Sequence, residues 1–349
     1  MPRSKQKAAP RSDVDMLADG LLIGDRRSLA RAITLVESSR LEHRADARAL
    51  LARITPSSGN AIRIGVSGVP GVGKSSFIEA FGTHIIEQGH RLAVLAVDPS
   101  SGRTGGSVLG DKTRMARLAS NPSAFIRPSP SAGTLGGVAR RTRETIVLCE
   151  AAGYDVVLVE TVGVGQSEYA VADMTDMFLL LMLPGGGDEL QGMKRGIVEL
   201  ADLVLVNKAD GELQAAATRA AADYSNALRL FKPRVRGWTV PVETCSAREG
   251  KGIAEAWKQV ESFRNRFTQD GSIGRRRGEQ ARAWLWNEIR EGLSAALMSD
   301  RAIAERVRVL ESGVVSGEIA VADAASEVVE SFLHRNSPGE GVKKREKAK

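Results

Sequence analysis

The stretch IRIGVSGVPGVGKSS, residues 62–76, decides the expected fold of this chain. It joins a short apolar run, Ile62–Val66, to the pattern G-x-x-x-x-G-K-S over Gly68–Ser75, and a helical run starts near Ser76. Glycines let backbone N–H groups converge on a phosphate because they carry no Cβ, and the N-terminus of the following helix adds partial positive charge. A strand, this glycine-rich loop and a helix together predict a phosphate-binding P-loop.

The P-loop pattern assigns expected roles to nine consecutive residues. We expect Lys74 to bridge the β- and γ-phosphates of a nucleotide, and the Ser75 hydroxyl to complete the shell of a Mg²⁺ ion. The whole loop is expected to bind the nucleotide, and its residues are Gly68, Val69, Pro70, Gly71, Val72, Gly73, Lys74, Ser75 and Ser76.

Short apolar runs alternate with helical segments from the P-loop onward. Most of the runs are continuously apolar, as in strands that are buried on both faces of a parallel sheet. Strands separated by helices predict a doubly wound, mostly parallel α/β sheet, in which ligands bind at the carboxyl ends of the strands. The expected strands are Ile62–Val66, Leu92–Val97, Val156–Val159, Met177–Leu183, Leu203–Val206 and Val240–Thr244.

Helical extensions flank the predicted P-loop domain at both ends, because apolar residues recur there at helical spacing. We divide the chain into a helical extension over 13–58, the P-loop domain over 59–268 and a C-terminal helical region over 269–335. Residues 1–12 and 336–349 are basic and are expected to be disordered tails. The C-terminal helices either pack back on the sheet or need a partner surface, and we expect them to form a homodimer.

The composition is ordinary for a soluble globular protein and disfavours several other classes. The 349 residues carry a net charge of +7, but much of the excess lies in the basic ends and aromatic residues total only 4%, so no nucleic-acid partner is expected. No apolar run approaches the roughly 18 residues that a membrane span needs. Cys149 and Cys245 lie far apart and form no disulfide or metal pattern. Without a secretory signal we expect a cytoplasmic protein.

The choice of base is predicted from the motif N-K-A-D, which begins at Asn207 directly after an expected strand. Asp210 can accept hydrogen bonds from both the ring N–H and the exocyclic amine of guanine, and adenine offers no such pair of donors. Lys208 is expected to lie along the base, and Asn207 to connect neighbouring loops. Ser246 and Ala247 form a further loop whose backbone N–H is expected to contact the guanine carbonyl oxygen. The sequence therefore predicts a protein that binds and hydrolyses GTP.

The Mg²⁺ side of the site needs carboxylates near the ends of strands. Asp98 follows one expected strand, Glu160 closes another, and Asp111 lies in a glycine-rich loop. With Ser75 they form the expected metal-binding set, in which some members act through water because Mg²⁺ keeps several of its waters. Taken alone, Asp111 is as well explained by an exposed acidic loop position. Gly163 is placed for its N–H to sense the γ-phosphate.

A further glycine-rich segment, PGGGDELQ over residues 184–191, also follows an expected strand. It either reaches the nucleotide or a partner, or is an ordinary flexible loop, and the sequence alone favours neither. The four histidines are scattered and none pairs with a cysteine, so no metal-delivery site is expected. They are His43, His84, His90 and His334.

Taken together, these motifs resemble those of the methylmalonyl-CoA mutase-associated GTPases, the MeaB/ArgK type of P-loop GTPase. The resemblance extends over roughly residues 13–335, and the combination of motifs is more specific than any one of them. The stretches that carry it are Gly68–Ser76, Asp98–Ser101, Gly110–Met115, Glu160–Gln166, Pro184–Lys194 and Asn207–Asp210.

The resemblance implies a chaperone of an adenosylcobalamin-dependent acyl-CoA mutase. Members of the family form homodimers through their C-terminal helices and use GTP to gate cofactor loading and to protect the mutase. The resemblance places Mg²⁺ contacts at Ser75, Asp98, Asp111 and Glu160, and a third switch at Asp188–Lys194. Intrinsic hydrolysis is expected to be slow and to be completed by the partner. The candidates for catalysis are Lys74, Glu160, Gln166, Gln191 and Lys194, of which Gln166, Gln191 and Lys194 are alternatives for placing the attacking water.

Two other functions remain alternatives. One is nickel delivery by a metallochaperone GTPase, against which the scattered histidines and cysteines argue. The other is an ATPase or kinase linked to basic amino-acid transport, against which the N-K-A-D motif argues. The sequence does not identify which acyl-CoA mutase is the client.

Overall fold

The structure is a computed structural model that describes residues 12–38, 40, 42–97, 115–128, 135–161, 167–185 and 195–336. The chain divides into two compact units, Met1–Arg276 and Arg277–Lys349, and each is described by itself. No helix among the described residues is both long enough and apolar enough to span a membrane.

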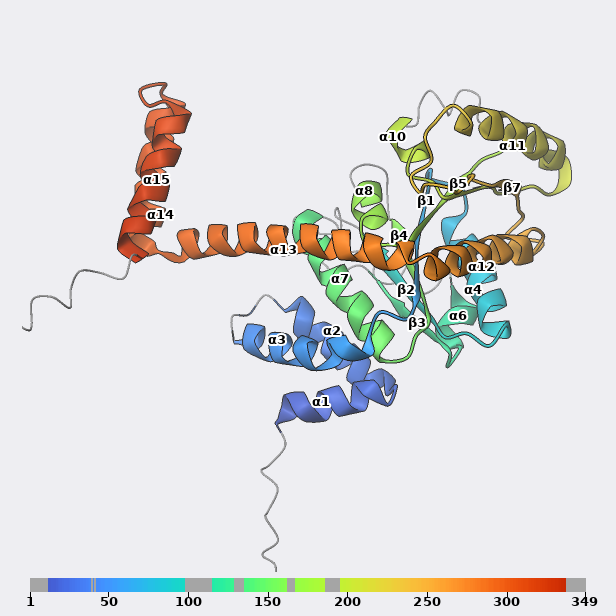
Figure 1. The fold of residues 1–349 in the computed structure, drawn as a ribbon, viewed down its shortest axis with the longest axis horizontal. Helices are drawn as coiled ribbons and strands as arrows, with labels where there is room; N and C mark the ends of the chain where they lie inside the picture. The colour runs from blue at the N-terminus through green and yellow to red at the C-terminus, as the bar shows by residue number, and fades with distance from the viewer. Residues whose placement is uncertain are drawn as a thin grey trace, which may run out of the picture. The chain divides into compact units, whose positions relative to one another are not determined.

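A parallel sheet is the centre of the first unit (Figure 1). In the described residues seven strands follow the order β3-β2-β4-β1-β5-β6-β7, and every neighbouring pair is parallel. The predicted doubly wound sheet is therefore confirmed. The strands are β1 (Ile62–Gly68), β2 (Leu92–Val97), β3 (Ala124–Arg127), β4 (Val156–Thr161), β5 (Met177–Met182), β6 (Leu203–Val206) and β7 (Val242–Thr244).

Helices cover both faces of this sheet, with α4, α6 and α12 on one side and α7 and α8 on the other (Figure 1). Helix α11 packs against β6 and β7. The bounds are α4 (Lys74–Glu87), α6 (Ala116–Ser120), α7 (Leu135–Ala151), α8 (Ser167–Ala172), α10 (Arg195–Val198), α11 (Gln214–Leu228) and α12 (Ile253–Gln269), with a 3₁₀ turn η3 (Gly211–Leu213) before α11.

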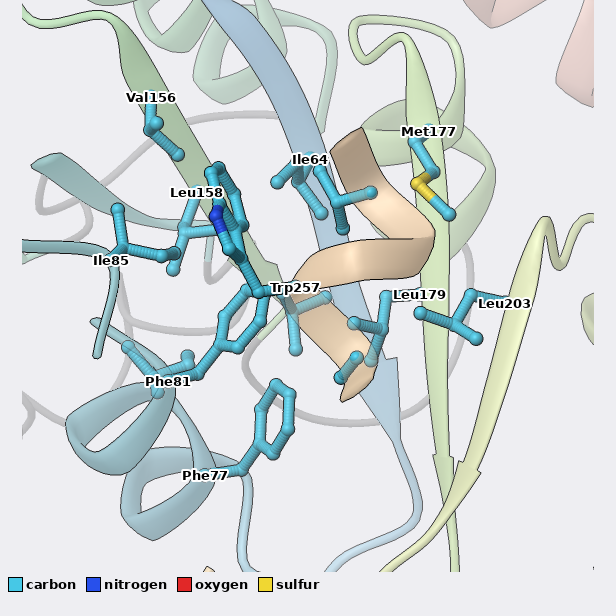
Figure 2. Packing of buried hydrophobic residues seen from close by; sticks show 14 of the residues in the cluster. Ile64, Phe77, Phe81, Ile85, Val156, Leu158, Met177, Leu179, Leu203 and Trp257 are labelled. Atoms are coloured by element: carbon cyan, nitrogen blue, oxygen red, sulfur yellow. The ribbon is translucent and has the colours of Figure 1, made fainter. Parts of the chain in front are cut away.

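The core between the sheet and helices α4 and α12 is rich in aromatic side chains. The rings of Phe77 and Phe81 stack with centroids 5.0 Å apart, and Trp257 meets Phe81 edge to face at 6.0 Å. Figure 2 shows these three side chains gathered beside strand residues that include Ile64 and Leu158. All five are buried, and such aromatic pairs add to the free energy gained by burial, so this core fixes the start of α4 relative to β1.

The N-terminal helices pack mainly on α7 (Figure 1). They are α1 (Asp13–Leu22), α2 (Arg26–Glu37) and α3 (His43–Ile54), and a 3₁₀ turn η1 (Thr55–Ser57) follows them. Ser12 caps α1 in a reciprocal capping box with Asp15, and Arg53 of α3 pairs with both Asp15 and Asp19. Charge-assisted hydrogen bonds of this kind hold α1 against α3.

The second unit consists of helices. Helix α13 (Ser272–Ser299) starts in the first unit and continues past Arg276, and α14 (Arg301–Val315) and α15 (Val321–Asn336) follow. Asp300 caps α14 by accepting from Ala302 N at 2.9 Å, and Arg306 of α14 donates to Glu327 of α15 at 2.6 Å. Within the unit, α14 and α15 therefore form a paired hairpin.

Both cysteines of the chain are buried and free. Cys149 lies in α7 and Cys245 directly after β7. Burial raises the pKa of the Cys149 thiol, and burial with the carboxylate of Glu243 nearby raises the pKa of Cys245 to about 12. Because the thiolate is the reactive form, both thiols are protected chemically as well as sterically.

We expect the native protein to react very slowly with a disulfide reagent at pH 8. Both thiols should react only as the chain unfolds, because a raised pKa leaves almost no thiolate at this pH. The measurement is the rate of thionitrobenzoate release in buffer and in increasing urea. One thiol that reacts within seconds in buffer would contradict the burial described above.

Candidate nucleotide site

The P-loop connects β1 to α4 at the carboxyl edge of the sheet, where ligands of such sheets bind. A Cβ at Gly68 would lie 2.6 Å from the carbonyl oxygen of Leu181 on the neighbouring strand, so no other residue fits there. Gly73 has φ +89°, which favours glycine, and a Cβ there would lie 3.0 Å from Asn207 Nδ2. Within the described residues no side chain caps the N-terminus of α4, which leaves its first N–H groups for a phosphate.

Lys74 is the first residue of α4 and is partly buried at the loop. Its Nζ donates to the carbonyl oxygen of Gly68 at 2.7 Å. Burial lowers the pKa of this ammonium group, and the carboxylates of Glu160 and Glu168 partly offset that effect. The side chain is therefore held at the loop, where the two carboxylates partly offset the cost of burying its charge.

Glu160 lies at the end of β4 and is nearly buried, with 4% of its surface exposed. It stands opposite Val66 in the ladder between β4 and β1, two residues before Gly68. Next to it, Thr161 donates to Ser67 Oγ at 2.9 Å and joins the two strands where the P-loop begins. Glu160 and Ser75, in the first turn of α4, supply oxygen donors of the type that Mg²⁺ prefers.

Glu168 in α8 is not among the site residues that the sequence motifs predict. Only 1% of its surface is exposed, and its charge acts on Lys74. It comes two residues after the glycine-rich segment 161–166, in the first turn of a short helix. A carboxylate so close in sequence to the segment that is predicted to sense the γ-phosphate is the signal that points to it.

Asn207 connects three loops of the site. Its Nδ2 donates to the carbonyl oxygen of Val72 in the P-loop at 2.8 Å. Its Oδ1 accepts from the backbone N–H of Ala247 at 3.1 Å and from the Cys245 thiol at 3.5 Å. The side chain is 2% exposed, so these bonds form away from water, where unpaired polar groups are costly.

Asp210 stands at the edge of the same cluster and accepts a hydrogen bond from Ser246 Oγ. Ser246 Oγ in turn accepts from the backbone N–H of Glu249 at 3.1 Å, which orients the hydroxyl. Lys208 adopts a left-handed backbone with φ +62°, a conformation that costs energy for a residue with a Cβ. The backbone conformation of the N-K-A-D segment is therefore set by hydrogen bonds to neighbouring loops rather than by an intrinsic preference for helix or strand.

Ala247 makes a contact that the sequence motif does not predict. Its backbone N–H, expected to donate to the guanine carbonyl oxygen, donates to Asn207 Oδ1 in the structure, and the N–H of Ser246 donates to Lys251 O at 2.9 Å. To contact guanine without losing this bond, the Ala247 N–H would have to be shared between Asn207 Oδ1 and the guanine carbonyl oxygen.

We expect Asn207→Ala to lower the affinity for GDP by about tenfold or more, since each buried partner left unsatisfied costs about 1–3 kcal/mol. The variant leaves Val72 and Ala247 without their partner and loosens the P-loop from the base-binding loop. Titration with a fluorescent GDP derivative measures the effect. Asn226→Ala, an exposed asparagine on α11, is the matched control; equal affinities for the two variants would rule out the connecting role.

Six of the predicted site residues lie outside the described part of the chain: Asp98, Asp111, Gly163, Gln166, Gln191 and Lys194. The structure does bring together Val72 of the P-loop, Asn207 and Ala247 through two hydrogen bonds, and it joins Ser246 to Asp210. Among the residues that are described, no group of three or more His, Cys, Asp or Glu is placed to hold a metal ion.

Comparison with known proteins places this arrangement among GTPases. The family model described as "Methylmalonyl Co-A mutase-associated GTPase MeaB" matches residues 29–302. A protein of Caulobacter vibrioides described as a putative GTPase is 54% identical over 323 residues, covering 93% of this chain and 99% of its own. The mouse protein described as "Methylmalonic aciduria type A homolog, mitochondrial" is 49% identical over 333 residues, covering 93% and 80%.

One solved structure is similar over nearly the whole chain. A crystal structure described as a LAO/AO transport system kinase is 37% identical, with a TM-score of 0.73, and covers 94% of this chain and 100% of its own. The similarity therefore extends beyond the P-loop domain to the helices at both ends.

Proposed function

The chain belongs to the family of methylmalonyl-CoA mutase-associated GTPases. On this premise we propose that it uses Mg²⁺-dependent GTP hydrolysis to act as a chaperone of an adenosylcobalamin-dependent acyl-CoA mutase. GTP binding and hydrolysis follow from the family. The mutase as client is supported by the description of the family and by the name of the mouse relative. In the proposed cycle, GTP gates cofactor loading and protects the mutase.

The observation that carries the nucleotide assignment is the side chain of Asn207. It joins the P-loop to the loops that hold Asp210 and Ala247 through bonds of 2.8 and 3.1 Å. A guanine base held by Asp210 would then lie at a fixed distance from the phosphates held by the P-loop. In this role Lys208 lies along the base, and Ser246 orients the Asp210 carboxylate.

The phosphate side of the proposed site rests on Lys74, Ser75 and Glu160. Lys74 binds the β- and γ-phosphates as a point charge, and the N–H groups at the start of α4 orient them. Ser75 and Glu160 fit a Mg²⁺ ion because both present oxygen donors near the P-loop, and Asp98 and Asp111 complete the proposed set. A bound Mg²⁺ ion would neutralise part of the negative charge on the β- and γ-phosphate oxygens.

Slow intrinsic turnover, with the partner completing the site, is part of the proposal. Gln166, Gln191 and Lys194 are the candidates for placing the attacking water. The proposed assembly is a cytoplasmic homodimer joined through the C-terminal helices, and large apolar side chains exposed on α13, such as Trp286 and Leu293, support such an interface.

The test of this proposal is a titration of the GTPase with a purified mutase. We expect GTP hydrolysis to accelerate and to saturate near equal concentrations, and we expect the Lys74→Ala protein to hydrolyse GTP far more slowly with the mutase as well as without it. Gel filtration with GDP and with a non-hydrolysable GTP analogue measures complex formation directly. No acceleration and no nucleotide-dependent complex with any acyl-CoA mutase would reject the client while leaving the GTPase assignment intact.

A second candidate follows from the solved structure described as a transport system kinase. A kinase of this type would transfer the γ-phosphate of ATP to a protein of basic amino-acid transport. Transfer of labelled phosphate from ATP to a periplasmic binding protein for basic amino acids would support this second function. The pairing of Asp210 with Ser246 beside Asn207 favours guanine and argues for the first proposal.

A further inference from the structure

Helix α8 lies directly against the strand that leads into the P-loop. A Cβ at Gly65 of β1 would lie 2.8 Å from Val171 Cγ1 in α8 and 3.0 Å from Thr175 Oγ1, closer than side chains tolerate. Thr175 also donates to the carbonyl oxygen of Val171 at 2.8 Å, which ties the residues after α8 back to the helix. Gly65 precedes Gly68 by only three residues, so α8 packs against the part of β1 that leads into the P-loop.

The same helix contacts α10. A Cβ at Gly196 would lie 1.9 Å from Tyr169 Oη, so the tyrosine side chain occupies the space beside this glycine. Helix α8 begins directly after residues 162–166, and α10 begins directly after residues 186–194. Helix α8 is therefore in contact with β1 on one side and with α10 on another.

The C-terminal end of α8 is held by two arginines. Arg276, near the start of α13, donates from Nη1 to the carbonyl oxygen of Asp176 at 2.7 Å and from Nη2 to that of Ala172 at 3.4 Å. Arg234 donates from Nη1 to the same Ala172 oxygen at 3.2 Å, and its guanidinium pairs with Asp202. Ala172 is the last residue of α8, where a positive charge is favourable to the helix.

The position of Arg276 is fixed by its surroundings. Burial and the neighbouring Arg234 lower the pKa of Arg276 to about 10, and the carboxylates of Asp202, Asp176 and Asp173 offset this. The guanidinium is partly buried, and a charge that is removed from water is costly unless it is hydrogen-bonded, so its bonds to the two carbonyl oxygens favour this position. Its planar fork reaches two carbonyl oxygens at once, which the single ammonium of a lysine does not reproduce.

We infer that Arg276 is a positioning residue for GTP hydrolysis, which acts by holding the C-terminal end of α8 and so fixing α8 against β1 beneath the P-loop. Arg276 lies far along the chain from the nucleotide motifs and belongs to none of them. It stands on α13, the helix that leads into the second unit, so the first turns of that helix are linked to the rate of hydrolysis.

The test compares Arg276→Gln and Arg276→Lys with Arg275→Gln in the full-length protein. Arg275 is the adjacent arginine on the same helix, and it bonds only with residues of its own turn among the described contacts, Asp270 and Ser272. Three quantities are measured: kcat for GTP at saturating nucleotide, the Kd for GDP, and hydrogen exchange of the α8 backbone, residues 167–172.

For Arg276→Gln we expect kcat to fall by about tenfold, because a small misplacement of aligned groups is costly, while the Kd for GDP stays within about twofold. Exchange in α8 should rise. Arg276→Lys should keep the fold by keeping the charge and should show a similar loss of kcat, since its single ammonium cannot bridge both carbonyls. Arg275→Gln should leave all three quantities unchanged.

Two results would overturn the inference. One is a loss of GDP affinity in parallel with kcat, which would mean that Arg276 only stabilises the fold of the domain. The other is faster exchange in α8 with an unchanged kcat, which would mean that α8 is held by Arg276 but does not govern hydrolysis. If Arg276→Gln does not fold, Arg276→Lys alone decides between these outcomes.

Discussion

Replacing Asp210 by asparagine is expected to lower the affinity for GDP by about a hundredfold or more. Guanine presents two donors, its ring N–H and its exocyclic amine, to the two oxygens of the carboxylate. The asparagine amide offers one carbonyl oxygen, which accepts, and one NH2 group, which only donates, so a donor of the protein would face a donor of the base without a partner. The asparagine oxygen can still accept from Ser246, so the loop should keep its shape.

The decisive measurement is a switch of base rather than a loss of binding. Xanthine carries a carbonyl oxygen where guanine carries the amine, so the Asp210→Asn protein should bind XDP more tightly than GDP. Asp223→Asn, an exposed aspartate on α11, is the matched control and should keep its preference for GDP. Unchanged GDP affinity in the Asp210→Asn protein would mean that another group reads the base.

Replacing Lys74 by alanine is expected to reduce the rate of GTP hydrolysis by about 10²–10³, the size of effect seen when one electrostatic contact to a developing charge is lost. Lys74 is held in the loop by Gly68, where burial favours its neutral form and Glu160 and Glu168 favour its charged form. In the proposed site, removing it takes away the ammonium group that would contact the γ-phosphate.

Single-turnover hydrolysis at saturating GTP measures this effect without interference from product release. The affinity for GDP should fall less than that for GTP, because the lost contact includes the γ-phosphate. Lys258→Ala, an exposed lysine on α12, should hydrolyse GTP at the normal rate. If the rate in the Lys74→Ala protein were also normal, the proposed role of the P-loop lysine would be wrong.

Much of the fold could be predicted because buried parallel strands are continuously apolar. The runs at Leu92–Val97 and Leu203–Val206 match β2 and β6 residue for residue. Strand β3 was missed because Ala124–Arg127 is a short edge strand with only three apolar residues. The run expected from Val240 begins as a strand only at Val242, after Pro241, which lacks an N–H to donate to the ladder.

In the site, residues that belong to short sequence motifs could be predicted, whereas contacts between residues far apart in the chain could not. The P-loop and N-K-A-D motifs are local patterns, so the sequence predicts them directly. Arg276 stands in a run of three arginines, and nothing in the sequence distinguishes it from Arg275. Only the folded chain brings Arg276 to Asp176, one hundred residues away, and Arg63 to the carboxylate of Glu150, 87 residues away. Such partners depend on the topology of the sheet, which a single sequence leaves open.

Because both native thiols are buried, a cysteine introduced at the surface could be labelled selectively for spectroscopy without other changes to the chain. A cysteine introduced at an exposed position, such as Ser299 of α13, would be the fastest thiol in the molecule to react, because Cys149 and Cys245 are shielded and protonated. A spin label or dye could then be attached without first removing native cysteines from the core. Pairs of such labels would report distances across the nucleotide cycle in an otherwise unaltered protein.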